Sequence, residues 1–405
     1  MTLRQAGITL IDCDHRTPPA VAEGIPYIAI PQLKNGHIDL SGARRISPSD
    51  YAEWTKKLKL RAHDVVVVRR CNSGDSALIP PRLDCAIGQN LVVLRSNGTT
   101  VERTFLRCRH IPSFELTIPP MDDQRPIAAL LDSLDDRIAL LRETNVTLEA
   151  IAQALFKSWF VDFDPVRAKS QGLAPAGMDQ ATAALFPDGF EESALGRLPV
   201  GWRAGELEDC ASLNSLSWSA RSRPDRVWYL DLANVKDNEV ASIQSFSFDE
   251  APSRARRVLR DGDTIVGTVR PGNRSFAYIH EPMAGLTGST GFAVLSPKSP
   301  EFAAFTYLAS TQDVSIEHLS HVADGGAYPA VRPEIVSALP CVVPTTEVLR
   351  QFDTVARPML QKIASNQRQA QTLATLRDTL LPRLISGQLR LPVAVEAIAE
   401  ATHAD

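Results

Sequence analysis

Two matching stretches decide the fold, and the first, residues 122–160, reads DDQRPIAALLDSLDDRIALLRETNVTLEAIAQALFKSWF. The second, residues 347–385, reads EVLRQFDTVARPMLQKIASNQRQAQTLATLRDTLLPRLI. In both, apolar residues recur every three or four positions, which predicts a helix with one apolar stripe. Adding 225 to each position of the first apolar stripe reaches a position of the second, except that Leu141 maps to Asn366. The stripes are Ile127, Leu130, Leu134, Ile138, Leu141, Leu148, Ile151, Leu155 and Trp159, and then Phe352, Val355, Met359, Ile363, Leu373, Leu376, Leu380 and Leu384.

Each helix of roughly 35 residues would be about 50 Å long and could not bury its stripe alone. Because the stripes match, we expect the two helices to pack against each other, and the domain between them allows an antiparallel pair. Asn145 and Asn366 would set the register of this pair at some cost in stability. Pro126 is tolerated in a first helical turn, whereas Pro358 lies well inside the second helix and predicts a kink or a break.

The regions before the two helices also repeat, at an offset near 200. The strand-like run 64–69 resembles 263–268, and Gly88 before 91–94 resembles Gly288 before 292–295. The offset becomes 225 at the helices, so the first half of the repeat lacks about 25 residues between Phe105 and Ile118. The corresponding part of the second half contains the loop HVADGGAYP, residues 321–329.

Composition narrows the class of protein. The chain has 405 residues, 44% of them hydrophobic and 22% charged, which predicts globular domains with real cores. A helix that spans a membrane needs an apolar run of about 18 residues or more, and the sequence contains none. We also find no signal sequence and no CxxC pair among the six cysteines, so we expect a cytoplasmic protein with reduced thiols. The net charge of −4 hides a mildly basic first region, in which residues 1–120 carry +5.

Four motifs carry a family resemblance. They are IPPMDDQR (118–125), ALFKSWFVDFDP (154–165), LPVGW (198–202) and LLPRLISG (380–387). In this order, and from about Thr9 to Leu389, the chain closely resembles the specificity subunit of Type I restriction-modification systems. The resemblance implies a mixed α/β fold with two similar target-recognition domains, separated by two long antiparallel coiled-coil helices.

On this basis we divide the chain into six parts. They are a first recognition domain (1–120), the first helix (121–163), a linker (164–199), a second recognition domain (200–344), the second helix (345–388) and a C-terminal tail (389–405). By the change of offset in the repeat, the first recognition domain is shortened by about 25 residues.

The resemblance implies a non-catalytic DNA reader. Each domain would read one half of a split, asymmetric double-stranded DNA site, while the helices set the spacer and dock two methyltransferase subunits and the restriction-translocase subunits. No cofactor is expected in this chain; S-adenosylmethionine, ATP and Mg²⁺ would belong to the partner subunits. The sequence contains no methyltransferase motif and no GxxxxGK[ST] loop. Two alternatives stay open: a stand-alone nuclease or methyltransferase, and a decayed or regulatory relative that reads only one half-site, because its first domain is short.

Arg and Asn side chains in loops after strands are the strongest candidates for reading DNA, since Arg matches guanine and Asn matches adenine in the major groove. The two loops are equivalent in the repeat. A second class, basic residues outside these loops, would contact phosphates, which positions the protein without specifying sequence. The candidates are Arg69, Arg70, Asn72 and Ser73 in the first loop, Arg270, Asn273 and Arg274 in the second, Gln89, Asn90, Ser289 and Thr290 in turns, Tyr328 as an aromatic contact, and Lys34, Arg44, Arg45, Arg221 and Arg223 for phosphates.

Three acidic groups could suggest metal sites, but simpler roles explain them. Asp50, Glu53 and Lys56 fit an exposed helix face, and Asp162 with Asp164 fits a helix end and turn. His15 lies beside Asp12 and Asp14 in a predicted turn. We therefore predict no metal ligands in this chain.

Overall fold

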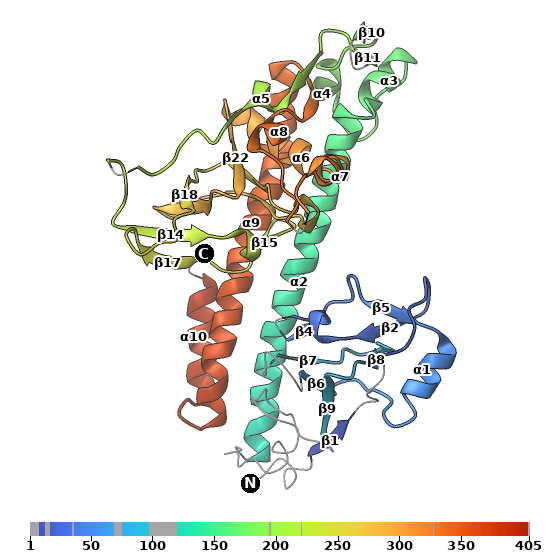
Figure 1. Cartoon of the computed structure of the whole chain (residues 1–405), viewed down its shortest axis with the longest axis vertical. Helices are drawn as coiled ribbons and strands as arrows, with labels where there is room; N and C mark the ends of the chain where they lie inside the picture. The colour runs from blue at the N-terminus through green and yellow to red at the C-terminus, as the bar shows by residue number, and fades with distance from the viewer. Residues whose placement is uncertain are drawn as a thin grey trace. The chain divides into compact units, whose positions relative to one another are not determined.

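Two helices of 40 residues each, α2 (Met121–Phe160) and α9 (Thr346–Ile385), organise the structure (Figure 1). The structure is a computed structural model that describes residues 8–12, 17–34, 36–68, 75–96, 120–193, 196–219, 221–326 and 328–403. These residues form two units. The first extends to Ser133 and includes Leu376–Glu400, and the second comprises Leu134–Thr375.

The two helices pack against each other in opposite directions. In the first unit, Ile127 of α2 shares a buried cluster with Leu384 of α9. In the second unit, the rings of Phe160 and Phe352 lie 4.8 Å apart between centroids. Residue numbers thus rise along one helix as they fall along the other, which confirms the predicted antiparallel pair.

The two asparagines of the predicted stripes meet inside this pair. The Asn366 side chain donates to the Asn145 Oδ1 at 2.8 Å, and the Asn145 side chain donates to the backbone oxygen of Ile363 at 3.3 Å. Asn366 is 1% exposed, and its own Oδ1 receives no hydrogen bond from any described residue. A buried acceptor without a partner costs about 1–3 kcal/mol, so this contact favours one alignment of the helices more than it stabilises them.

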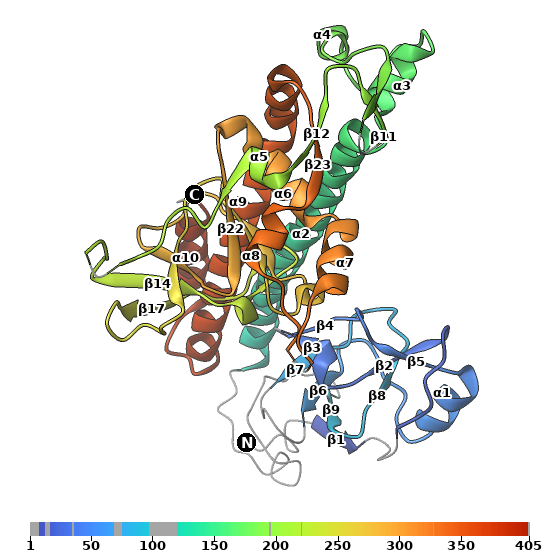
Figure 2. The same ribbon diagram turned by 45° about the horizontal axis from the view of Figure 1, so that its top comes forward.

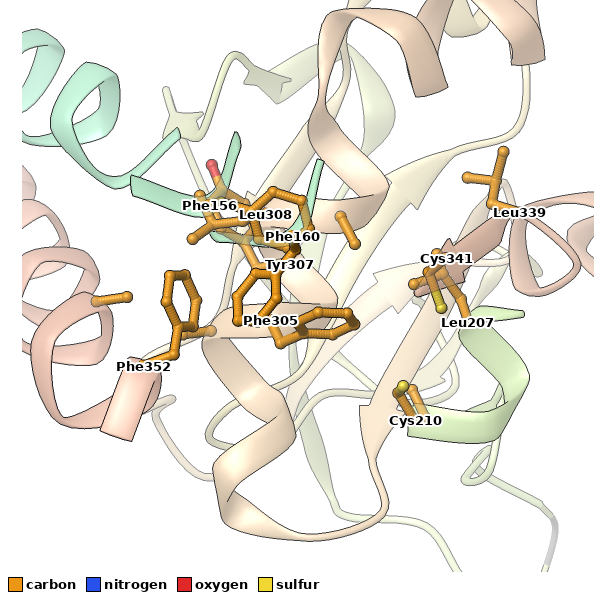
Figure 3. Close-up of a cluster of buried hydrophobic side chains, with 14 of the residues drawn as sticks. Phe156, Phe160, Leu207, Cys210, Phe305, Tyr307, Leu308, Leu339, Cys341 and Phe352 are labelled. Atoms are coloured by element: carbon orange, nitrogen blue, oxygen red, sulfur yellow. The ribbon is translucent and has the colours of Figure 1, made fainter. Parts of the chain in front are cut away.

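An aromatic cluster fills the junction between α2, α9 and α6 (Ala303–Thr311), as Figure 3 shows. Phe156 lies 5.3 Å from Phe305 and 6.0 Å from Phe352, measured between ring centroids. Tilted and edge-on aromatic pairs of this kind add about 0.5–1.5 kcal/mol each beyond the area they bury. This cluster therefore fixes the second domain to the helix pair.

The predicted stripe is wrong at two positions. Ile151 is 46% exposed and Val355 is 38% exposed, whereas the small residues Ala152 and Ala356 are fully buried. The inner face of α2 passes instead through Ala152 and Phe156, because α6 also packs on this part of the pair. Small residues at this face allow the backbones to approach each other closely.

Of the kink or break expected at Pro358, the break is wrong, because α9 continues through the proline. The proline removes one backbone hydrogen bond of the helix. Buried Leu360 and an ion pair of 2.7 Å between Arg357 and Asp353 hold the helix on either side. Pro126 lies five residues after the start of α2 at Met121, beyond the predicted first turn, and the helix continues through it too.

The two domains contain the same sheets. The larger sheet of the first domain has the order β1-β9-β6-β7, all antiparallel, from Ile8–Asp12, Leu91–Ser96, Val65–Val68 and Ser76–Leu78. Its equivalent in the second domain has the order β13-β22-β19-β20, also antiparallel, from Ala211–Leu213, Phe292–Pro297, Thr264–Gly267 and Phe276–Tyr278. The predicted internal repeat is therefore confirmed at the level of strand order.

A second, smaller sheet repeats as well. In the first domain its order is β5-β2-β8, from Arg44–Ile46, Ile25–Ile28 and Ala86–Ile87. In the second domain it is β17-β14-β21-β18, from Gln244–Ser247, Arg226–Leu230, Leu286–Ser289 and Ala255–Val258, and Figure 2 shows several of these strands from a second direction. The first pair of strands is antiparallel and the next is parallel in both sheets, and β18 adds an edge strand to the second. Both domains also carry a short hairpin, β3–β4 (Leu33–Lys34, His37–Ile38) and β15–β16 (Val235–Lys236, Glu239–Val240).

The same turn precedes the central strand in both domains. The carboxylate of Asp64 accepts a hydrogen bond from the Arg61 backbone at 2.8 Å, and that of Asp263 accepts one from the Arg260 backbone at 2.7 Å. Both aspartates are buried. The repeat thus extends to the side chains that satisfy buried backbone groups.

The second domain continues through helices α6, α7 (Asp313–Val322) and α8 (Pro333–Ser337), the strand pair β12–β23 (Arg203–Glu206, Pro340–Val343) and the short α5 (Leu207–Cys210). The stretch between Phe105 and Ile118, where the sequence predicts the shortening, lies outside the described residues.

Three segments differ from the sequence interpretation. The predicted linker 164–199 contains α3 (Asp164–Ser170), α4 (Gln180–Ala184) and the hairpin β10–β11 (Phe190–Ser193, Gly196–Pro199), held by buried Phe186 and Leu198. The predicted tail contains α10 (Leu391–His403), where Ala394 is buried in a cluster with Leu384. Helix α1 (Pro48–Trp54) ends before Lys56, which the sequence interpretation placed on the same helix face as Asp50 and Glu53. No described helix combines the length and the apolarity needed to cross a membrane.

We predict that Phe156→Ala lowers the free energy of unfolding by about 3–5 kcal/mol, because it leaves a cavity where two helices and α6 meet. Ile151→Ala, on the exposed side of the same helix, should change it by less than about 1 kcal/mol. Urea unfolding followed by circular dichroism measures both. Equal losses would contradict the packing described for α2.

Candidate nucleic-acid interface

The loop after β19 is held in a strained conformation. It contains a short 3-10 turn, Pro271–Asn273, which is flanked by Arg270 at φ 48° and Arg274 at φ 60°. Left-handed backbone is unfavourable for residues other than glycine and costs of order 1–3 kcal/mol each. The exposed Asn273 lies at this turn, beside a hollow of about 440 Å³ that Gly272, Arg274, Ile316, Glu317, Ser320 and His321 line.

The structure brings together two candidates that are far apart in sequence. The Arg270 guanidinium lies over the Tyr328 ring, 4.7 Å from its centroid, and the Arg270 backbone donates to the Pro329 oxygen at 2.7 Å. Tyr328 is 72% exposed, as an aromatic residue that contacts a ligand would need to be. A cation stacked on an exposed ring offers both charge and a flat apolar surface to a ligand.

The other arginine of this loop, Arg274, is half-buried and paired within its own domain. Arg274 is bonded to Asp237, pairs with Asp313 at 2.7 Å and lies over the Phe276 ring at 5.2 Å. Its charge is therefore matched by two carboxylates of its own domain. This arrangement supports the loop and leaves Arg270 as its outward-facing cation.

Backbone hydrogen bonds join four segments into what we call the loop edge, which consists of residues 254, 268–274, 289–291 and the described residues of the last segment, 324–326 and 328–331. Thr290 donates to the Arg254 oxygen at 2.8 Å, Thr268 donates to the Gly291 oxygen at 2.9 Å, and Val331 donates to the Thr268 oxygen at 2.9 Å. The predicted turn residues differ in access. Ser289 is buried, and its hydroxyl accepts from the Gly291 backbone, while Thr290 is exposed.

Four arginines on and beside the edge strand β18 escaped the sequence interpretation. Arg256 and Arg257 lie within the strand, Arg254 directly before it and Arg260 two residues after it. Among the described residues, Arg254 pairs with Asp231 at 2.6 Å, whereas no carboxylate forms an ion pair with the other three. The sequence signal was the run RARRVLR, residues 254–260, which crowds four positive charges into seven residues.

These cations are held by neutral groups. Arg257 and Arg260 donate to the hydroxyls of Ser217 and Ser215 at 3.3 Å each, and Arg256 lies over the Phe248 ring at 5.0 Å. Burial lowers the pKa of Arg257. Positive charge that is anchored but not neutralised is the arrangement that binds phosphates.

Arg223 lies over the same Phe248 ring at 5.2 Å and is bonded to Asp249. Arg221, two residues earlier, is exposed. Of these two predicted phosphate contacts, Arg223 is thus neutralised by a carboxylate, whereas Arg221 faces solvent.

The predicted residues of the first domain make local contacts. Lys34 pairs with Asp39, and the Arg44 and Arg45 guanidinium groups donate to the backbone oxygens of Pro18 and Gly24 at 2.9 and 3.0 Å. Gln89 is exposed and Asn90 half-buried in the turn before β9. The loop that holds Arg69, Arg70, Asn72 and Ser73 lies outside the described residues.

The acidic groups considered for metals have ordinary contacts. Asp50 accepts from the Ser47 hydroxyl at 2.7 Å near the start of α1, and Asp164 accepts from the Ser158 hydroxyl at 2.7 Å. Asp162 is bonded to Lys157. His15 lies outside the described residues. Within the described ranges, no three His, Cys, Asp or Glu side chains gather as a metal site would require.

The known proteins that this chain resembles are specificity subunits of Type I restriction enzymes. No protein-family model matches the chain. Over 350 residues it is 27% identical to the Type I restriction enzyme HindI specificity subunit of Haemophilus influenzae, a match that covers 72% of each protein. Over 305 residues it is 24% identical to the Type I restriction enzyme MjaIX specificity subunit of Methanocaldococcus jannaschii, covering 73% of this chain and 65% of the relative.

A solved structure shares the fold. The chain is similar to the S subunit of a Type I restriction-modification system from M. genitalium, with a TM-score of 0.50 and 14% identity over 95% of both chains. At this identity the likeness supports the arrangement of helices and sheets.

We predict that Arg270→Gly changes the free energy of unfolding by less than about 1 kcal/mol. Glycine relieves the left-handed backbone strain, which offsets the loss of an exposed cation–π contact of about 0.5–1 kcal/mol. Gly267→Ala serves as the contrast, because its new Cβ would lie 2.9 Å from the Ser275 Cβ and should destabilise the domain by about 1–3 kcal/mol. Thermal unfolding of both variants checks this, and a large loss for Arg270→Gly would make that arginine a structural residue.

Proposed function

We propose that this chain, which belongs to the family of Type I restriction-modification specificity subunits, recognises a bipartite DNA sequence and scaffolds the enzyme subunits that act on it. It is a DNA sequence-specificity subunit. The proposal adds that each domain reads one half-site and that the helix pair binds two methyltransferase subunits, which the restriction subunits join. It also places the chain in the cytoplasm, without an active site of its own.

The repeated domain is the observation that carries this proposal. Two domains with the same strand orders, joined by one antiparallel helix pair, suit a target with two separated parts. Rigid helices would fix the distance between the parts, as dimer geometry does in other DNA-binding proteins. A single compact reader would need no such spacing element.

In the second domain, the loop edge would contact DNA bases, and the arginines on and beside β18 would contact the phosphates of the DNA backbone. Arg270 presents a guanidinium that can bind guanine in two places, and Tyr328 supports it from below. Arg256, Arg257 and Arg260 would neutralise phosphates, because no described carboxylate pairs with them.

A second candidate is a regulatory relative that binds methyltransferase subunits but reads only one half-site. The shorter first half of the repeat supports it. Helices α6 and α7 of the second domain occupy the part of the repeat where about 25 residues are missing from the first. One experiment separates the two candidates.

We expect the chain, co-produced with its methyltransferase subunit in a host free of DNA methylation, to direct methylation of adenines in a motif with two defined halves. Sequencing that detects modified bases measures this directly. One defined half would favour the regulatory relative. A stable complex without any methylation, or no complex at all, would contradict the proposed function.

The two kinds of DNA contact should respond differently to mutation. In the complex, Arg270→Ala should weaken binding to the target by about 1–3 kcal/mol and have little effect once the second half-site is scrambled. Arg260→Ala should weaken binding to both DNAs equally and reduce the slope of log K against log salt by about 0.9. Fluorescence anisotropy at several salt concentrations measures both effects.

Arg203→Ala is the matched control, because that arginine pairs with Asp209 at 3.0 Å on the strand pair β12–β23, outside the loop edge. It should leave both DNAs unaffected. An equal loss on both DNAs for Arg270→Ala would make it a phosphate contact.

A further inference from the structure

The hairpin β15–β16 ends in an unusual turn. Its two tip residues, Asp237 and Asn238, both have left-handed backbone, with φ of 46° and 63°. Asparagine tolerates this conformation better than most residues. Asn238 is also 6% exposed, although a hairpin tip is normally solvated.

Every polar group of Asn238 has a partner. Two partners come from its own domain: its backbone N–H donates to the Phe276 oxygen at 2.9 Å, and its Oδ1 accepts from the Tyr278 backbone at 2.9 Å. The other two come from the helix pair: its Nδ2 donates to Glu149 of α2 at 3.2 Å, and its backbone oxygen accepts from the Gln367 side chain of α9 at 2.5 Å. One residue therefore bonds strand β20 to both long helices.

Glu149 extends this contact to a third element. Its Oε1 accepts a hydrogen bond from the Tyr307 hydroxyl of α6 at 2.9 Å, while its Oε2 faces Asn238. Burial raises the pKa values of Glu149 and Tyr307, so both groups are costly to leave unpaired. We name Glu149, Asn238, Tyr307 and Gln367 the hairpin clamp.

Directional hydrogen bonds resist sliding of the domain along the helices better than apolar packing does. The aromatic junction between α2, α6 and α9 is held by non-directional contacts, which a small slide along the helices would preserve in part. In the hairpin clamp, a shift of one helical residue, about 1.5 Å, would stretch or misalign the bonds that join the domain to the helices. The clamp thus defines one position of the second domain along the helix pair.

We propose that Asn238, with Glu149 and Gln367, is a positioning residue that fixes the second domain at one place on the helix pair and so sets the allowed distance between the two DNA half-sites. This inference rests on the proposed function. It means that the distance between the half-sites depends on this polar contact within the second unit as well as on the length of the helices.

The repeat offers a natural control for this idea. By the hairpin registers, Gly36 occupies the first-domain position that corresponds to Asn238. By the helix offset of 225, Ala374 and Arg142 correspond to Glu149 and Gln367. Gly36 and Ala374 have no polar side chain, so the bond between Asn238 and Glu149 has no counterpart in the first half of the repeat.

The test is Asn238→Gly, which places the residue of the first hairpin in the second. Glycine accepts the left-handed turn without strain, so the hairpin should fold while the side-chain bonds to Glu149 and Tyr278 are lost. The readout is methylation of duplexes in which the mapped half-sites are separated by the natural spacer, or by one base pair more or fewer, using the complex with the methyltransferase subunit. We expect methylation at the altered spacers, relative to the natural one, to rise about ten-fold, the effect expected for losing a hydrogen bond to a charged group.

Gln367→Ala, which removes only the bond from α9, should shift the same ratio in the same direction. Glu239→Ala, at the exposed neighbouring position of the hairpin, should leave the ratio unchanged. A lower melting temperature with an unchanged ratio, or an equal loss of methylation at all spacers, would make the clamp purely structural and overturn the inference. If methylation by the wild-type complex itself does not depend on the spacer, the proposed function and this inference both fail.

Discussion

The antiparallel packing of α2 and α9 is the constraint on which the rest of the structure depends. Neither helix can bury its apolar stripe alone, so each exists as an ordered element because the other covers it. The contact between the helices is aliphatic in the first unit, with Ile127 and Leu384, and aromatic in the second, with Phe160 and Phe352. The buried pair of Asn145 and Asn366 between these regions opposes any sliding, because a shifted helix would leave both amides without partners. The elements that pack on this helix pair, including α6 and the hairpin β15–β16, are therefore positioned by the alignment of the two helices.

Sequence periodicity predicted the helix pair, because matched stripes bury each other. A separate repeat near an offset of 200 predicted the two similar domains, and the family resemblance implied the antiparallel direction. The periodicity misassigned Ile151 and Val355, which lie at the rim of the stripe. A spacing of three or four identifies one apolar face, but which neighbours of that face are buried depends on what else packs there. Here Ala152 lies in the buried cluster that also includes α6, and small residues give no signal in a hydrophobic pattern. The same limit explains the linker and the tail, whose short elements depend on single buried side chains such as Phe186 and Ala394.

The candidate interface shows a similar division. The loop after β19 could be predicted, because polar and glycine residues follow a strand of apolar residues in both halves of the repeat. The stacking of Arg270 on Tyr328 could not be, since it depends on the backbone bond from Arg270 to Pro329, which joins segments far apart in the chain. Nor could the burial of Ser289, which occupies the end of a strand whose neighbours cover it. The arginines of β18 were visible in the sequence, but only the sheet order places them on and beside the last strand of the sheet.

Comparison of the two domains separates what the repeat preserves from what it varies. Both keep the buried aspartate that closes the turn before the central strand, because an unpaired backbone group would be costly there. The residues around this aspartate differ. In the first domain, Arg95 pairs with Asp64 at 2.7 Å, whereas in the second domain Ser296 occupies the strand position equivalent to Arg95. Burial raises the pKa of Asp263 in the second domain. The side chains at the hairpin tips and on the edge strands differ as well. Two identical domains related by an antiparallel pair would present identical surfaces, which suits a symmetric target. Conserved backbone geometry with divergent surface residues instead suits two unlike half-sites, and it lets the second domain be fixed on the helices by contacts that the first lacks.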